Sequence, residues 1–282
     1  SLYKLGRNHL FLGDLAAADS CFQELSHSDD ATWRVSGLVA LSYAPMYEGR
    51  LQEAIGVLDR GINLIEEDPE LKLSQHLHFQ KAVAYEIAGD LEQALEQIQT
   101  AIQINREQSP NNHTYKRHFL IHVLARLGEL QEAERVAVEM GQNRKPARDT
   151  LRHAFARGAI ELFGGNPSTA LPFYKRAAED TVIPYVPANI MAARTYFDLG
   201  RPEDGLAELA KLETDHSDFR LFLTPWSALT HYYRAKGHEM LGDSARAMEE
   251  YHTFVELWED ADPNIDELKD ARIRLANLQN PL

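Results

Sequence analysis

Residues 88–102 read AGDLEQALEQIQTAI, in which a glycine is followed by apolar residues at helical spacing. The same context occurs seven times along the chain: an apolar helix, a glycine, and a second helix with a small residue five positions on. The glycines are separated by 36, 40, 39, 37, 35 and 42 residues, and they are Gly13, Gly49, Gly89, Gly128, Gly165, Gly200 and Gly242. Self-similarity at this period indicates an array of repeated helix pairs.

Alignment on the seven glycines reveals three further positions with a shared character. The residue five positions after the glycine is small in every copy: Ala18, Ala54, Ala94, Ala133, Ala170, Gly205 and Ala247. The residue nine positions after it is mostly large and apolar: Phe22, Leu58, Ile98, Ala137, Tyr174, Leu209 and Tyr251. The residue seven positions before it is small in six copies of seven: Gly6, Ser42, Ala82, Ile121, Gly158, Ala193 and Ala235. Small residues at fixed places let neighbouring helices approach closely.

This pattern resembles the tetratricopeptide repeat, a helix–turn–helix unit of about 34 residues. Tyr85 and Tyr196 fall on the family's first-helix tyrosine, and five copies depart from it, with His9, Pro45, Leu124, Glu161 and His238. The resemblance implies an all-α fold, a right-handed superhelical solenoid of about seven helix pairs over residues 1–282. A capping helix is expected at about residues 264–279, because a repeat array needs a terminal helix with a polar outer face.

The repeat also predicts where helices begin and end. The second helix of each copy should start two residues after the glycine. Turns between copies are expected at Asp29-Asp30, Asp68-Pro69, Ser109–Asn112, Lys145-Pro146, Pro184 and Thr224-Pro225. Pro45 and Pro172 fall inside helical pattern, where each should end, offset or kink its helix. No strand pattern of period two stands out.

Composition and charge limit the classes of function. The net charge of −14 disfavours binding of nucleic acid or an anionic membrane by the whole surface, although residues 113–158 carry nine basic and five acidic side chains. No apolar run is long enough to cross a bilayer, and no signal peptide is apparent. Cys21 is the only cysteine, which suits a reducing, cytoplasmic setting. The start at Ser1, without Met, indicates a fragment of a longer protein.

No catalytic, metal or cofactor constellation is apparent. Phosphate-binding loops, nucleophile elbows and zinc spacings of cysteine are missing. His118 and His122 share a helix face at a spacing that can chelate a divalent metal, but no motif supplies a further ligand. The interpretation preferred for them is a polar groove face. Acid pairs such as Glu66-Glu67 are interpreted as solvated helix faces. The sequence therefore predicts a protein that is not an enzyme, and an enzyme that holds a small molecule in a repeat cleft is the weakest hypothesis.

The resemblance implies that a partner binds the concave surface formed by the first helices, at about ten, six and three positions before each glycine. Carried over with their neighbours, the candidate groove residues are Arg7, Tyr43, His76, Phe79, His118, His122, Arg126, Arg152, Phe155, Arg194, Phe197, Tyr232 and Lys236. Aromatic and arginine side chains often anchor interfaces, and arginine pairs with carboxylates. The expected partner is a protein or an acidic peptide. The alternative is that many of these residues pack between neighbouring copies.

Two details of the resemblance refine this hypothesis. The family's carboxylate clamp is not reproduced, because Tyr3 and Arg7 stand where its first Lys and Asn would be. The tail is similar to the end of tetratricopeptide regions in bacterial serine/threonine kinases and winged-helix regulators, through Tyr251, Phe254, Leu257-Trp258, Asp260–Pro263, Ile265 and Leu268-Lys269. It implies an alternative function, a sensory or regulatory domain of a signalling protein. The identity of the partner and the oligomeric state stay open.

Overall fold

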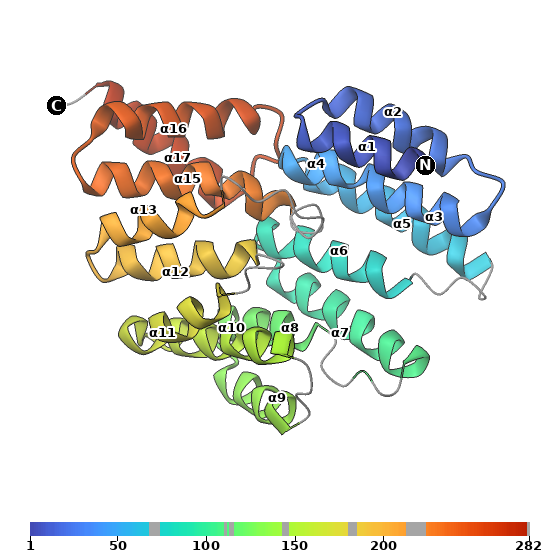
Figure 1. Cartoon of the computed structure of the whole chain (residues 1–282), viewed down its shortest axis with the longest axis horizontal. Coiled ribbons are helices and arrows are strands. Elements are labelled where there is room, and N and C mark those ends of the chain that lie inside the picture. Colours follow the sequence, from blue (N-terminus) through green and yellow to red (C-terminus); the bar gives the residue numbers. More distant parts are fainter. Residues whose placement is uncertain are drawn as a thin grey trace. The chain divides into compact units, whose positions relative to one another are not determined.

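The computed structural model describes residues 1–67, 74–109, 112, 116–142, 147–179, 185–212 and 224–280. Over these residues every regular element is a helix and none is a strand, so the predicted all-α solenoid of helix pairs is confirmed (Figure 1). The helices form two compact units. Unit 1 comprises Ser1–Asn112 with Asp260–Asp262, and unit 2 comprises His113–Glu259 with Pro263–Leu282.

Each unit is a succession of packed helices, labelled as in Figure 1. Those of unit 1 are α1 (Leu2–Phe11), α2 (Leu15–Ser26), α3 (Ala31–Leu41), α4 (Tyr43–Tyr47), α5 (Leu51–Glu67), α6 (Ser74–Ala88) and α7 (Leu91–Gln108). Those of unit 2 are α8 (Arg117–Arg126), α9 (Leu130–Gln142), α10 (Ala147–Phe163), α11 (Pro167–Ala177), α12 (Val186–Asp198), α13 (Pro202–Ala210), α15 (Thr224–Met240), α16 (Ser244–Leu257) and α17 (Asp266–Gln279). The first helices of the four copies in unit 2 are thus α8, α10, α12 and α15.

The seven glycines make the turn within each pair. All seven have φ between +69° and +84°, the left-handed region that a Cβ makes unfavourable. The second helix begins two residues after the glycine in every copy, as predicted. In three copies an aspartate after the glycine caps this helix: the Oδ1 atoms of Asp14, Asp90 and Asp243 accept a hydrogen bond from the backbone N–H three residues on.

The small residues of the repeat lie under large side chains. A Cβ on Gly6 would lie 2.6 Å from Phe22 Cε1, and one on Gly158 would lie 2.9 Å from Tyr174 Cδ1. In both copies the aromatic ring nine positions after the turn glycine therefore occupies the space left by the small residue seven positions before it. The glycine at position 205, where six copies have alanine, makes room for Phe197, whose Cε1 would lie 2.3 Å from a Cβ.

The prolines and turns agree with the predictions only in part. The helix that contains Pro45 is broken at Ser42 into α3 and α4, as predicted. Pro172 lies inside α11, which continues to Ala177, so this proline does not end its helix. Thr224-Pro225 forms the start of α15 instead of a turn, because proline is tolerated where the first N–H groups have no intrahelical acceptor. The turns expected at Asp68-Pro69, Pro110, Lys145-Pro146 and Pro184 lie outside the described residues.

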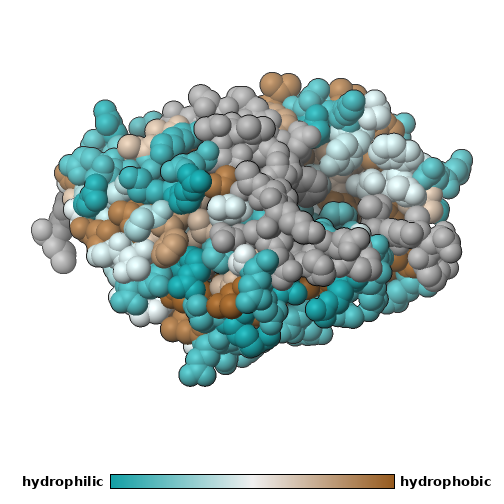
Figure 2. Space-filling view, turned by 60° about the horizontal axis from the view of Figure 1, so that its bottom comes forward, coloured by the Kyte–Doolittle hydropathy of each residue, from teal (hydrophilic) through white to brown (hydrophobic). Residues whose placement is uncertain are grey.

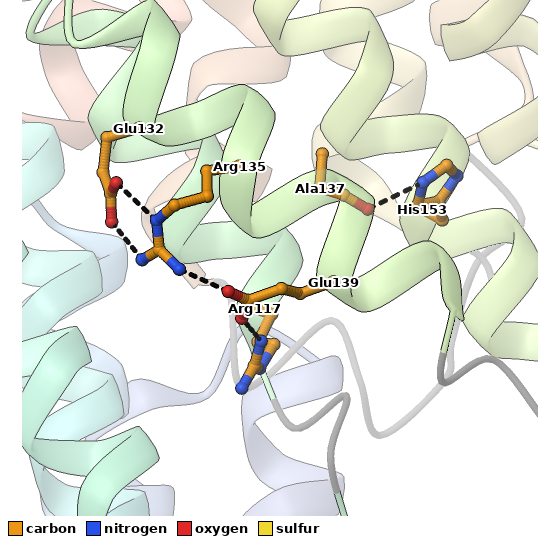
Figure 3. Close-up of polar contacts among 6 residues, drawn as sticks. All are labelled: Arg117, Glu132, Arg135, Ala137, Glu139 and His153. Atoms are coloured by element: carbon orange, nitrogen blue, oxygen red, sulfur yellow. Dashed lines mark hydrogen bonds and ion pairs between the residues drawn. The ribbon is translucent and has the colours of Figure 1, made fainter.

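Polar contacts join α9 to the helices α8 and α10. Arg117 of α8 donates to Glu139 of α9 at 2.9 Å, and Glu139 also pairs with Arg135 (Figure 3). On the other side, His153 Nε2 of α10 lies 3.2 Å from the carbonyl oxygen of Ala137. Exposed ion pairs add little to stability, so these contacts chiefly orient the helices. Hydrophobic residues on the face drawn in Figure 2 lie in small separate groups among hydrophilic ones.

Helix α17 closes the C-terminal end of unit 2, at the position where the sequence predicts a capping helix. Three apolar side chains of α17 and one directly before its start are buried against α15 and α16. They are Leu268, Ala271 and Leu275 within the helix and Ile265 before it. Ile273 on the opposite face is 62% exposed, amid charged residues. This one-sided burial is what a terminal helix of a repeat array requires.

Candidate functional site

The thirteen predicted groove residues are divided between the two units. Unit 1 contains four of them. Arg7 on α1 and His76 at the start of α6 are partly exposed, whereas Tyr43 and Phe79 are buried. Tyr43 lies edge-on to the ring of Phe22, with 6.3 Å between the ring centroids. The other nine are in unit 2, where the structure shows which of them come together.

In unit 2 a cluster of buried aromatic rings lies between the first helices. We call it the ring cluster, and its members are His118, His122, Phe155, Tyr185 and Trp226. The centroid of His122 lies 5.5 Å from that of Phe155 and 5.8 Å from that of Trp226. Phe155 lies 5.1 Å from Tyr185, which in turn lies 5.5 Å from His118. All five side chains are buried, so α8, α10 and α15 are joined by one continuous core.

Charged groups at the border of the ring cluster are also largely removed from water. The guanidinium carbon of Arg152 lies 3.5 Å from the centroid of Tyr185, and Arg152 is 8% exposed. Burial, and then the positive charge of Arg152, lower the pKa of Lys116 to about 7. Burial likewise holds the pKa of His118 well below its ordinary value, and Arg152, Lys116 and His122 lower it further. His118 is therefore a neutral core residue at physiological pH.

These contacts separate the predicted groove residues into two groups. His118, His122, Arg152 and Phe155 are packed inside unit 2, which is the role that the alternative interpretation gives them. Phe197 is buried above Gly205, and Tyr232 is buried with its hydroxyl donating to Asp270 Oδ2 of α17 at 2.7 Å. Arg126, Arg194 and Lys236 stay partly exposed. Of the nine predicted residues in unit 2, these three cations are therefore the ones whose side chains remain accessible to solvent.

The partly exposed cations lie toward the C-terminal ends of the first helices, together with Phe163. We call Arg126, Phe163, Arg194 and Lys236 the cationic strip. The guanidinium carbon of Arg194 lies 5.5 Å from the centroid of the Phe163 ring, which lies 5.6 Å from that of His122. Arg126 is one helical turn beyond His122 on α8. The strip therefore begins where the ring cluster ends.

Arg194 and Lys236 differ from most of the arginines and lysines around them. They occupy the same repeat position, six residues before Gly200 and Gly242, on α12 and α15, which pack together. Neither forms an ion pair within the described part of the chain, whereas Arg157 and Arg201 are paired with carboxylates. Burial, Arg274 and Arg194 lower the pKa of Lys236, which indicates that positive charge is concentrated at this point.

Phe163 is a candidate site residue that the sequence analysis missed. Phe163 lies two residues before Gly165, a position that was considered in only one copy, at Arg126 before Gly128. The same position holds aromatic residues in the first two copies, Phe11 and Tyr47. Inclusion of this position in the alignment would have identified it.

Neither a cluster of potential metal ligands nor a membrane-spanning helix occurs among the described residues. No three His, Cys, Asp or Glu side chains among them gather as metal ligands. His118 and His122, spaced for chelation, face aromatic rings instead. None of the described helices combines the length and apolar character needed to span a membrane.

Comparison with known proteins identifies the repeat. Residues 75–108 and 117–139 match the tetratricopeptide repeat. No curated protein matches the sequence significantly. In fold, the chain is similar to a tetratricopeptide repeat protein from Parabacteroides merdae, with 16% identity, a TM-score of 0.52, and 99% of this chain and 98% of that chain covered. The chain therefore contains tetratricopeptide repeats in an all-α array.

Two further solved structures align with the chain at lower similarity. One is described as the TPR2AB-domain:pHSP90-complex of yeast Sti1, with 14% identity, a TM-score of 0.39, and coverage of 99% of this chain and 97% of that one. The other is the TPR domain of P58(IPK), with 14% identity, a TM-score of 0.33, and coverage of 100% and 99%.

The tail residues that resemble bacterial signalling proteins have a structural role here. Tyr251, Phe254 and Trp258 of the α16 region are fully buried, and so are Ile265, at the N-cap of α17, and Leu268 within α17. The rings of Phe254 and Trp258 lie 4.6 Å apart. Packing of the last helix against the array is therefore sufficient to account for these residues.

Proposed function

We propose that the chain is a non-catalytic protein-interaction scaffold, and that the cationic strip of unit 2 binds an acidic peptide segment of a partner. The observation that carries the proposal is the pair Arg194 and Lys236. The two residues lie on first helices that pack together, both are partly exposed, and no described carboxylate forms an ion pair with either. Tetratricopeptide repeats at residues 75–108 and 117–139 support a scaffold of this kind.

Charge and shape both favour an acidic peptide. A carboxylate can accept hydrogen bonds from Arg194 and Lys236, and such charge-assisted bonds are about twice as strong as neutral ones. Phe163 offers an apolar surface beside Arg194 for the aliphatic part of a glutamate side chain. The chain as a whole carries a net charge of −14, so much of its surface repels an acidic ligand, and an exposed pair of cations is a favourable place for such a ligand to bind.

The proposal is tested with a fluorescein-labelled oligoglutamate peptide and the intact chain. The double variant Arg194→Gln/Lys236→Gln should bind the peptide at least about tenfold more weakly, because each lost bond to a charged group contributes about 1.5 kcal/mol or more. Fluorescence anisotropy titration measures the dissociation constant, and thermal unfolding verifies that the variant is folded.

A matched control removes the same charge from another surface. Lys175 and Arg176 are exposed on α11, so Lys175→Gln/Arg176→Gln also loses two positive charges. This control should bind the peptide as tightly as the unmodified chain. Equal weakening in the two double variants would show a general charge effect and would contradict a site at Arg194 and Lys236.

A further inference from the structure

The proposed acidic ligand has a counterpart within unit 2, on the capping helix. Asp270 of α17 accepts a hydrogen bond from the Tyr232 hydroxyl at 2.7 Å. The same hydroxyl accepts one from Lys236 Nζ at 3.3 Å. One carboxylate of the chain is therefore linked through a single hydroxyl to the ammonium group at the end of the cationic strip.

Asp270 belongs to a larger polar network with a basic residue of its own. Arg274 Nε donates to Asp270 Oδ2 at 2.7 Å, and Arg274 Nη1 donates to both carboxylate oxygens of Glu239 at 3.0 and 3.1 Å. Tyr251 donates to Glu239 at 2.9 Å. Glu239 is thus satisfied by Arg274 and Tyr251, whereas Asp270 faces both Arg274 and the Tyr232–Lys236 pair.

The electrostatic influence of Asp270 on Lys236 opposes that of the neighbouring arginines. Burial, Arg274 and Arg194 lower the pKa of Lys236, while Asp270 and Asp198 raise it. Asp270 therefore neutralises part of the positive charge that an acidic ligand would meet. The partly exposed Lys236 keeps room for a second carboxylate, because its only hydrogen bond within the described residues is to Tyr232.

We infer that Asp270 is a built-in competitor that sets the affinity and charge selectivity of the cationic strip. Asp270 supplies a negative charge close to Lys236, as the carboxylate of a bound peptide would. An incoming acidic group is therefore repelled by Asp270 when it binds to Lys236. This inference rests on the proposed function. It adds that the capping helix, besides covering the core, tunes the end of the strip nearest to it.

The test compares Asp270→Asn with Asp266→Asn, using the labelled oligoglutamate peptide and the intact chain. Both variants remove one negative charge from α17, but the Asp266 side chain is 90% exposed, and within the described residues its ion pair is with Lys269, at 3.3 Å. Asp270→Asn should tighten binding about two- to fivefold, in line with the loss of one partly screened charge interaction. Asp266→Asn should leave the dissociation constant unchanged.

A double-mutant cycle shows whether the effect passes through Lys236. In a chain that already carries Lys236→Gln, Asp270→Asn should have little effect on binding. If Asp270→Asn leaves a misfolded chain, Asp270→Ser with a thermal unfolding check replaces it. Unchanged or weaker binding by a folded Asp270 variant would overturn the inference, as would equal tightening by Asp266→Asn.

The proposed function and this inference fail in different ways. If the unmodified chain binds the peptide and loses binding with Arg194→Gln/Lys236→Gln, the strip is a binding site whatever Asp270 does. If neither the unmodified chain nor any Asp270 variant binds, both proposals are wrong. Binding that becomes measurable only in Asp270→Asn supports competition directly.

Discussion

The ring cluster and the cationic strip of unit 2 contain side chains of similar types in different environments. The ring cluster holds histidine, aromatic residues and a neighbouring arginine in a buried core, with Phe155 1% and His122 1% exposed. The cationic strip holds arginine, lysine and one aromatic ring at partly exposed positions. Residue type and repeat position therefore do not decide whether a side chain is packed in the core or stays accessible to solvent.

The largest difference in the free energy of unfolding is expected between a variant that lacks an aromatic ring of the ring cluster and one that lacks the aromatic ring of the cationic strip. Phe155→Ala should lower the free energy of unfolding by about 3–5 kcal/mol, because it leaves a cavity among four packed rings. Phe163→Ala at the partly exposed position should cost less than half as much. Chemical denaturation of the two variants measures both values. Similar losses of unfolding free energy would contradict the distinction between the ring cluster and the cationic strip.

A second prediction concerns the glycine that supports the ring cluster from below. Gly158→Ala places a methyl group 2.9 Å from the Tyr174 ring, which packs against Phe155 with 5.7 Å between centroids. We expect a loss of about 1–3 kcal/mol in unfolding free energy. The control is Gly56→Ala in α5, where no atom would lie within 4 Å of the new methyl group. This change should stabilise the chain by about 0.5–1 kcal/mol, and destabilisation there would show that helix propensity is not decisive.

Burial of His118 in the ring cluster makes the stability of the chain depend on pH. Burial and nearby positive charges depress the pKa of His118 in the folded chain, so the unfolded chain binds its proton more tightly. Its contribution to stability is complete above the unfolded pKa of about 6.5 and is lost as the pH falls below that value. The melting temperature should therefore decrease less in His118→Phe than in the unmodified chain between about pH 7 and pH 5. Parallel pH profiles would contradict a neutral buried imidazole.

The smallest effect on stability is expected in the cationic strip. Arg194→Gln removes a cation–π contact with Phe163 and no ion pair among the described residues, so unfolding free energy should change by less than about 1 kcal/mol. Binding of the oligoglutamate peptide should nevertheless weaken. A variant that is strongly destabilised would place Arg194 with the ring cluster instead.

The repeat framework could be predicted from the sequence because the same local contacts recur in successive copies. The left-handed glycine, the start of the second helix two residues later, and the pairing of Gly158 with Tyr174 all depend on residues close along the chain. Local spacing is sufficient to specify such contacts.

The contacts among the first helices of unit 2 could be predicted only in outline. Spacing places His122 and Trp226 on first helices. It does not show that α8 and α15 lie close enough for these two rings to be in contact. The distance between α8 and α15 depends on the rotation of each repeat copy relative to the next, summed over the three steps from α8 to α15. The network that joins Tyr232 to Asp270 likewise depends on the packing of α17.

The most direct test of the central claim is site-specific photo-crosslinking of the oligoglutamate peptide. A benzophenone amino acid is placed at Phe163 in the strip or at Phe173, a partly exposed control position on α11. The account predicts that the peptide crosslinks at position 163, that unlabelled peptide competes, and that position 173 gives no product. Crosslinking at position 173 but not at 163, with binding intact, would contradict the claim that the cationic strip holds the partner.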